Sequence, residues 1–436
     1  MVDTLVSERT KQQAAFMQRW LQHAPAPPDR GKNSYDAFIS YRSSDRAWAM
    51  ALYDALKLAK WDAFLDQYEL VPGSDLETSL TDALQASSSG VILWSSRTKD
   101  SEWCRRERNA MRTLRDQTGS FRYVFAKLDA EPLPLFAQAD LYLDFEESPE
   151  GPRGVNLLKL LSGMRGIPLA HEAVGMAHEV DQAARQAMLA IRGAAEAENP
   201  ARLLAIGTSA EPGVLASPGP VLAAARDLIS MGRCDDARDV LKHALAHFPQ
   251  STRARQLEGL ALRRLKRYQE AIEVLSELRA AGHQDPETMG MLGAAWDGLY
   301  QESGKTLHLR RARELYRTAF QGDPTNYYTG INAASKSLFL GETEEAVRLA
   351  TAILPLVEPA RDGEELWAAC TLGEIYLLQG KPDAAATQYQ KVVDTHPGKV
   401  GDLRGTRDQA RRICGALGLT EPDTKRVLAP FELLDT

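Results

Sequence analysis

Residues 35–45 read YDAFISYRSSD, and this stretch decides the fold. Its first eight residues form a short strand-like run. The SSD that follows supplies serine and aspartate side chains, which favour the N-cap of a helix. Trp48, Leu52 and Leu56 then recur every fourth residue, so they share one face of that helix. A strand that leads directly into an amphipathic helix is typical of α/β proteins.

The same alternation continues over the next hundred residues. Strand-like runs recur as WDAFLD at 61–66, GVILWSS at 90–96, FRYVFAKLD at 121–129 and LYLDF at 141–145. Helical patterns separate these runs, among them residues 76–85 and 101–115. Such alternation predicts a parallel sheet covered by helices on both faces. In sheets of this kind the ligand crevice lies at the carboxyl ends of the strands.

The second half of the chain carries a repeated helix–turn–helix pattern. An alanine recurs in the second helix of each pair, at Ala237, Ala271, Ala312, Ala346 and Ala384. The successive intervals are 34, 41, 34 and 38 residues, and 34 is the period of tetratricopeptide repeats. The two longer intervals predict insertions, one of them at residues 300–309. Stacked helix pairs of this kind predict an all-α solenoid with a concave face.

Shifts in composition predict the domain boundaries. We expect an N-terminal helix and proline-rich linker at 1–33, the α/β domain at 34–165, a helix and flexible linker at 166–216, the repeats at 217–417 and a C-terminal tail at 418–436. The flexible linker is predicted from GTSAEPGVLASPGP at 207–220, because such Gly, Ser and Pro content is typical of a mobile joint.

Composition also limits the classes of function. The chain has 436 residues, enough for two or three domains, and its net charge of −7 argues against nucleic-acid binding. Four widely spaced cysteines and eight dispersed histidines predict neither a disulfide framework nor a metal site. No Walker or G-x-G-x-x-G motif points to a nucleotide cofactor. A polar N-terminus and the lack of a long apolar run predict a cytoplasmic protein with no membrane segment.

Four segments, in the correct order, resemble the TIR domain. YDAFISYRSSD resembles its first strand and loop, and FLDQYELVPGSDLETSLTDAL at 64–84 its second strand and BB loop. SSSGVILWSS at 87–96 resembles a later strand, and SEWCRRE at 101–107 the S-x-W-C-x-x-E helix of plant and bacterial members. The resemblance covers about Tyr35–Leu161 and implies a flavodoxin-like fold with a five-stranded parallel sheet. Two departures affect loop details: RTKD follows ILWSS, and VFAKLD lacks a proline.

A shorter resemblance lies in the repeat half. NYYTGINAASKSLFLGE at 326–342 is similar to a segment in the helical regulatory region of stress-activated MAP kinase kinase kinases, and to bacterial proteins that share it. Together the two resemblances imply a bacterial-type TIR protein fused to a tetratricopeptide-like module.

The TIR resemblance implies an activity and a set of site residues. Enzymatic members cleave NAD+, as substrate rather than cofactor, into nicotinamide and ADP-ribose or a cyclic isomer. Their catalytic glutamate matches Glu107, and a carboxylate suits the positive charge that develops on the ribose. Family positions also nominate substrate-binding residues: Tyr41, Arg42, Asp66 and Trp103. Leu70 and Gly73 fall in the BB loop, through which TIR domains contact one another.

A second function, from a different class, remains open. Many TIR domains are adaptors, and a fold alone does not confer an activity. In that case the protein is a signalling scaffold, with homotypic TIR contacts and a peptide partner on the repeats. Glu107 would then be a solvated surface charge, Tyr41 a core residue and Asp66 a turn cap. In the enzyme hypothesis, the repeats bind an unknown protein or another copy of the chain and so regulate NAD+ cleavage. A role in antiphage defence or cell death is implied by the family resemblance alone.

Overall fold

A computed structural model describes residues 23–42, 45–65, 76–98, 102–134, 142–149 and 151–435. The chain divides into two compact units, Met1–Leu265 and Lys266–Thr436, so the division falls within the repeats. The N-terminal helix predicted within the 1–33 segment, at about residues 3–21, lies outside the described residues.

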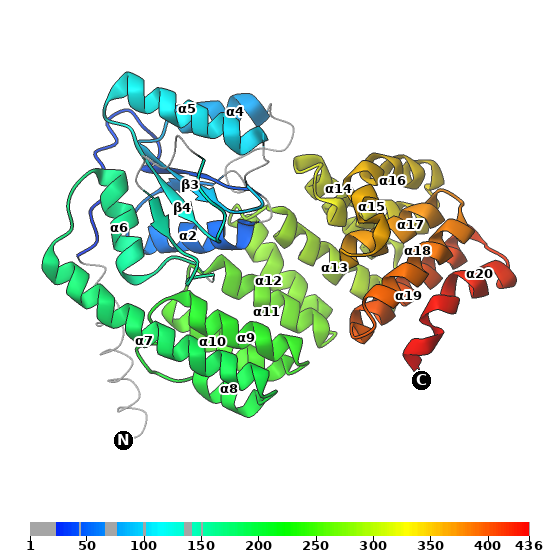
Figure 1. Cartoon of the computed structure of the whole chain (residues 1–436). Coiled ribbons are helices and arrows are strands. Elements are labelled where there is room, and N and C mark those ends of the chain that lie inside the picture. The colour runs from blue at the N-terminus through cyan, green and yellow to red at the C-terminus, as the bar shows by residue number, and fades with distance from the viewer. Residues whose placement is uncertain are drawn as a thin grey trace. The chain divides into compact units, whose positions relative to one another are not determined.

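The first unit contains a five-stranded parallel sheet (Figure 1). Its strands are β1 (Ala37–Ser40), β2 (Ala63–Phe64), β3 (Ser89–Trp94), β4 (Arg122–Lys127) and β5 (Tyr142–Asp144). Their order across the sheet is β2-β1-β3-β4-β5, which is the flavodoxin-like order. The predicted fold class of this half is therefore confirmed.

Helices cover both faces of the sheet, as Figure 1 shows. One face packs on α2 (Arg46–Leu58) and α6 (Gly154–Arg165), and the other on α4 (Leu76–Gln85) and α5 (Glu102–Thr118). Alternate strand residues divide between the two faces: Ile39 joins the α2 and α6 side, whereas Phe38 joins the other. This period of two is what a doubly covered sheet requires.

One glycine lets α5 lie close to the sheet. A Cβ atom at Gly90 of β3 would lie 2.7 Å from Sδ of Met111, a fully buried residue of α5. Because Gly90 has no side chain, the helix approaches the strands closely at this level. The position of α5 matters because it carries Glu107.

In the described part of the first unit, the helices that follow α6 are α7 (His171–Glu196), α8 (Pro200–Gly207), α9 (Pro218–Ser230), α10 (Cys234–His247) and α11 (Thr252–Arg264). The N-terminal half of α7 belongs to the core of the α/β domain, through residues such as Ala177 and Val180. Its C-terminal half belongs to the core of the first repeat helices, through Ile191 and Ala194. One continuous helix is therefore shared by two hydrophobic cores.

The prediction of a flexible joint at 207–220 is wrong. Val214, Leu215 and Ala216 are each at most 1% exposed, and Pro218 already begins α9. A Cβ atom at Gly213 would lie 2.2 Å from the carbonyl oxygen of Ala183 in α7. The glycine therefore permits close packing of the segment against α7, and its presence did not signal mobility.

The second unit consists of paired helices and confirms the predicted helical repeat fold. They are α12 (Tyr268–Ala280), α13 (Pro286–Ser303), α14 (Thr306–Gly322), α15 (Tyr327–Phe339), α16 (Thr343–Val357), α17 (Leu366–Leu378), α18 (Pro382–Thr395), α19 (Val400–Leu417) and α20 (Glu421–Leu428). Of the predicted repeat alanines in this unit, Ala271, Ala312 and Ala346 are fully buried. Ala384 is not: the neighbouring Ala385 takes the buried position, so that interval is 39 residues.

The insertion predicted at 300–309 lengthens two helices instead of forming a loop. Helix α13 has 18 residues and α14 has 17, with only Gly304 and Lys305 between them. Helices α11 and α12 have 13 residues each. The extra residues thus continue the two helices. Gly304 adopts a left-handed backbone conformation that ends α13, and α14 begins two residues later.

The prediction of a tail at 418–436 is also wrong. Helix α20 and the 3₁₀ helix Ala429–Asp435 pack on the solenoid, and both Val427 and Phe431 are fully buried. The ring of Phe431 lies 5.2 Å from that of Tyr389 in α18. This segment therefore caps the last repeat, as the ends of solenoids require.

Candidate functional site at the carboxyl end of the sheet

Glu107 lies on the side of α5 that faces the sheet. Cys104 and Met111, three residues before it and four after it, are buried, and Glu107 between them is half-buried. Arg105 and Arg106 are exposed on the opposite side. Glu107 is therefore partly shielded from solvent, on the side of α5 that faces the sheet.

A hydroxyl group of the sheet contacts this carboxylate. Ser40 is the last residue of β1, and its Oγ donates a hydrogen bond to Oε2 of Glu107 at 2.6 Å. The serine is 1% exposed, and hydrogen bonds from a neutral donor to a charged acceptor are among the stronger ones. Sequence reasoning missed Ser40. The signal was present: in AFISY, a period of two places the serine on the face opposite Ile39, where α5 packs.

The loops after β1 and β3 are tied together beside this pair. Asp45, at the start of α2, accepts hydrogen bonds from the hydroxyls of Ser95 at 2.6 Å and Thr98 at 3.1 Å. An Arg42 guanidinium nitrogen donates to the carbonyl oxygen of Arg97. These bonds tie together the loops at the carboxyl ends of β1 and β3, the edge at which α/β folds bind ligands.

Asp129, after β4, holds the next part of this edge. It accepts hydrogen bonds from the backbone and hydroxyl groups of Ser96, at 2.7 to 3.0 Å, and from the backbone of Glu131. Burial alone would raise the pKa of Asp129, but these hydrogen bonds outweigh it and lower the pKa. The ionised form of Asp129 is therefore favoured, and its hydrogen bonds hold the loops after β3 and β4 together.

The structure brings only some of the predicted site residues together. Arg42 and Glu107 both belong to the carboxyl edge of β1. Tyr41 is 8% exposed and packs in the hydrophobic cluster on the α2 and α6 side, which is the face opposite Glu107. Trp103 lies in α5, but its side chain is outside what the structure describes, as are Asp66, Leu70 and Gly73 altogether.

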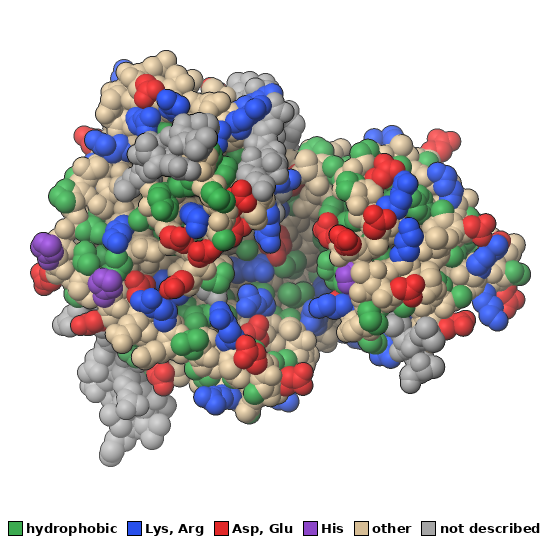
Figure 2. All heavy atoms as spheres, viewed as in Figure 1, with side chains coloured by type: hydrophobic (Ala, Val, Ile, Leu, Met, Phe, Trp, Pro, Cys, Tyr) green, Lys and Arg blue, Asp and Glu red, His purple; other side chains and the backbone are tan. Residues whose placement is uncertain are grey.

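Within the described residues, no group of three His, Cys, Asp or Glu side chains is arranged to hold a metal ion. The same residues include no helix that combines the length and apolarity needed to cross a membrane. All four cysteines are buried free thiols. On the face shown in Figure 2, acidic and basic side chains are interspersed.

The fold and the repeats together define a class: a flavodoxin-like α/β domain joined to a helical repeat module. Comparison with protein families gives the same division. Residues 37–158 match the TIR domain, residues 233–339 the Tetratricopeptide Repeats-Sensor family, and residues 371–398 a tetratricopeptide repeat. The chain is therefore a TIR-domain protein that carries tetratricopeptide repeats.

Individual relatives match over shorter spans. A protein of Brachypodium distachyon named "Probable 2' cyclic ADP-D-ribose synthase BdTIR" is 37% identical over 79 residues, which are 18% of this chain and 35% of that protein. The chain thus spans about a third of that curated relative. Among solved structures, a thermophilic tetratricopeptide repeat protein of Thermus thermophilus is 24% identical, with a TM-score of 0.37, over 45% of this chain and 97% of that one. The human IFIT1 dimer with PPP-AAAA is 14% identical, with a TM-score of 0.37, over 76% and 78%.

Proposed function

We propose that the TIR domain cleaves the nicotinamide–ribose bond of NAD+, and that Glu107 is the catalytic carboxylate. One observation carries the proposal: Glu107 is held by Ser40 at the carboxyl end of a central parallel strand, where α/β folds bind ligands. The 79-residue likeness to a probable cyclic ADP-ribose synthase supports the same type of chemistry.

The chemistry needs few groups from the protein. As the C–N bond to nicotinamide breaks, its electron pair leaves with the pyridine nitrogen, and positive charge develops on the ribose. A nearby carboxylate stabilises that charge, or accepts hydrogen bonds from the ribose hydroxyls, most strongly where water is excluded. Water then attacks the ribose and releases a proton, which gives ADP-ribose. Attack by a hydroxyl of the same molecule gives a cyclic isomer instead, and the proposal covers both products.

Other predicted residues receive roles under the same proposal. Arg42 contacts a phosphate of the substrate, and Asp66 and Trp103 border the pocket. Tyr41 has a positioning role: its ring packs in the core on the opposite face of the sheet and supports the end of β1, where Ser40 and Arg42 lie. Free, buried cysteines suit a cytoplasmic location. The proposed role in antiphage defence or cell death rests on the TIR resemblance alone.

The decisive experiment is direct. Purified full-length protein at high concentration is incubated with NAD+, and nicotinamide, ADP-ribose and cyclic isomers are separated by chromatography. Nicotinamide release above the uncatalysed background supports the enzyme. If folded protein released none at any concentration, the signalling-scaffold function would replace it.

Ser40→Ala should slow NAD+ cleavage by about 10- to 100-fold, because a hydrogen bond to a charged group contributes roughly 1.5–3 kcal/mol. Ser40 positions Glu107 and does not itself meet the substrate, so kcat should fall with little change in KM. Ser40→Thr, which keeps the hydroxyl group, should recover part of the rate. Equal rates for the alanine and wild-type proteins, measured at saturating NAD+, would remove Ser40 from the mechanism.

We also propose that self-association controls activity, through the BB loop with Leu70 and Gly73 and through the repeats. Specific activity should then fall on dilution, in step with mass measured by light scattering. Gly73→Val should lower both, since a β-branched residue cannot adopt the backbone angles open to glycine. A chain that ends at Leu265 should differ from the full chain in activity or assembly. Constant specific activity, with a monomeric mass at every concentration and in both chains, would contradict this.

A further inference from the structure

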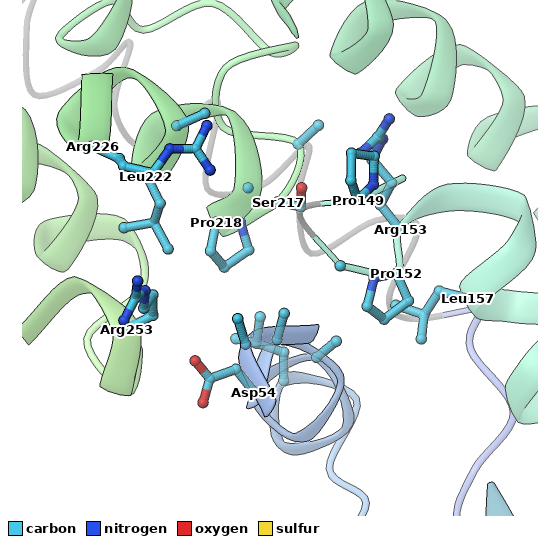
Figure 3. Close-up of a pocket in the computed structure, with 18 of the residues that line it drawn as sticks. Asp54, Pro149, Pro152, Arg153, Leu157, Ser217, Pro218, Leu222, Arg226 and Arg253 are labelled. Atoms are coloured by element: carbon cyan, nitrogen blue, oxygen red, sulfur yellow. The ribbon is translucent and has the colours of Figure 1, made fainter. Parts of the chain in front are cut away.

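The carboxyl group of Asp54 joins the TIR domain to the first repeat helices. Asp54 lies in α2 and accepts two hydrogen bonds at the start of α11, from the backbone N–H of Thr252 and the hydroxyl group of Ser251. All three residues are buried. Figure 3 shows this carboxyl group directed toward the side on which Arg253 lies, one residue after Thr252. A side chain of the TIR domain therefore contacts the N-terminus of a repeat helix.

These hydrogen bonds complete the cap of α11. The first N–H groups of a helix have no partner within the helix itself. Ser251 is the N-cap residue of α11, and its hydroxyl oxygen accepts the N–H of Ala254 at 3.2 Å. The hydroxyl hydrogen of Ser251 and the N–H of Thr252 are both donated to Asp54. The cap is thus built from two side chains, and one of them belongs to the TIR domain.

Apolar packing beside this contact is incomplete. A cavity of about 130 Å³ lies next to Asp54, between α2 and the N-terminal turns of α9 and α11 (Figure 3). Leu58, at the end of α2, packs against the core of the first repeat helices. Because the cavity interrupts the packing between these helices, the hydrogen bonds of Asp54 hold a larger part of the interface.

The contact does not require a buried charge. Burial raises the pKa of Asp54 to about 8, against its two hydrogen bonds, so the carboxyl group is mostly protonated at neutral pH. Three cations line the same cavity, and each is bonded to another group: Arg153, Arg226 and Arg253. The carbonyl oxygen of a neutral carboxyl group has two lone pairs, so it can accept both hydrogen bonds from α11.

The other end of α2 lies at the candidate site. Asp45, the residue directly before α2, accepts hydrogen bonds from Ser95 and Thr98 in the loop after β3. Asp54 follows nine residues later, which is about 14 Å along a helix. Leu52 lies between them and is buried in the core on the sheet, so α2 is held as one rigid element. A displacement of Asp54 therefore reaches Asp45.

We propose that Asp54 is the residue through which the first repeat helices control the geometry of the candidate site. Movement of α11 shifts α2, and α2 shifts the loop after β3 through Asp45. Asp54 is a positioning residue, since it acts on the site through other groups. The inference rests on the proposed function for the identity of the controlled site, whereas the coupling itself is measured without NAD+.

The test measures hydrogen–deuterium exchange in the full-length wild-type, Asp54→Ala and Asp54→Asn proteins at neutral pH. Asp54→Ala removes part of the cap, so exchange at the start of α11 should become about 10-fold faster. Exchange at residues 95–98, in the loop after β3, should become about threefold faster in the same variant. Asp54→Asn keeps the shape of the side chain and one carbonyl oxygen, so it should exchange like the wild type.

A second helix cap provides the matched control. Asp285 is also a buried aspartate, and it caps α13 by accepting the N–H groups of Glu287 and Thr288. Its contacts at this cap lie within the second unit. Asp285→Ala should speed exchange at the start of α13 by a similar factor and leave residues 95–98 unchanged.

Thermal melting shows whether each variant is folded. If Asp54→Ala does not fold, Ser251→Ala takes its place, because it removes one of the same hydrogen bonds from the side of α11. Wild-type exchange at residues 95–98 in the folded variant overturns the proposal, as does an equal change there in Asp285→Ala. The exchange samples contain no NAD+, so this result is independent of whether the protein cleaves NAD+.

Discussion

Glu107→Gln should abolish the release of nicotinamide from NAD+ while the TIR domain stays folded. The substitution keeps the shape of the side chain and can keep a hydrogen bond with Ser40, but it removes the negative charge. Loss of one electrostatic interaction with a transition state typically lowers kcat by ~10²–10³-fold. Chromatographic detection of nicotinamide, beside a thermal melt of the same sample, measures both parts of the expectation.

A matched control distinguishes this role from a general loss of negative charge on α5. Asp116 lies near the C-terminal end of the same helix, with a side chain that is 60% exposed. Asp116→Asn should leave the rate within about twofold, because an exposed charge far from the crevice contributes little. A folded Glu107→Gln protein with wild-type activity would refute the catalytic assignment.

Asp297→Ala should lower the unfolding free energy of the second unit strongly. Asp297 of α13 forms a two-pronged ion pair with Arg412 of α19, at 3.0 and 3.1 Å, and lies 3.4 Å from Nζ of Lys336 in α15. Lys336 is almost fully buried. Removal of the carboxylate breaks the ion pair of a buried ammonium group and leaves only the more weakly interacting Glu374 as an acidic neighbour. Loss of one partner of a buried ion pair costs roughly 3–5 kcal/mol of unfolding free energy. Urea denaturation measures the change.

An exposed pair on α19 provides the comparison. Asp408, with a side chain 60% exposed, pairs with Arg411 at 3.1 Å, and exposed pairs of this kind contribute about 0–1 kcal/mol. Asp408→Ala should therefore change the stability little. If Asp297→Ala were no more destabilising than Asp408→Ala, the buried network would not hold α13, α15 and α19 together.

The same network should show in the acid response. Burial alone would raise the pKa of Asp297, but Lys336 and Arg412 outweigh it and lower the pKa to about 2. The unfolded value is about 3.9, so the unfolded chain binds this proton first. The stabilisation is therefore fully present above about pH 4 and is lost as the pH falls toward 2. Asp297→Asn should lose this part of the acid dependence, which a pH series of urea denaturation curves would reveal.

The sequence predicts the parts of the fold that depend on local periodicity. Alternation of apolar runs with helical patterns gave five strands and their covering helices, and the alanine period gave the repeats. Close packing was harder to predict, because glycine suits both a mobile joint and a tight contact. At Gly213 the glycine serves a tight contact with α7, so the prediction of a mobile joint at 207–220 is wrong.

The candidate site was predictable only in part. Glu107 follows from its place in SEWCRRE, but its partner Ser40 is 67 residues away, and no local pattern links the two. Asp54 and its partners at the start of α11 are separated by almost two hundred residues, and no local pattern links these either. Such pairs are set by the packing of α5 and α11 on other elements, which local propensity does not encode.

Helix α7 has a mechanical consequence. Its 26 residues span about 39 Å at 1.5 Å per residue, and its two halves are embedded in two different cores. A continuous helix resists bending and twisting, so a tilt of the first repeat helices is passed to the TIR domain as a torque. Within the described residues, no flexible loop separates the two halves of this helix. The first repeat helices are therefore joined to the TIR domain by a stiff element, which fixes their direction as well as their distance.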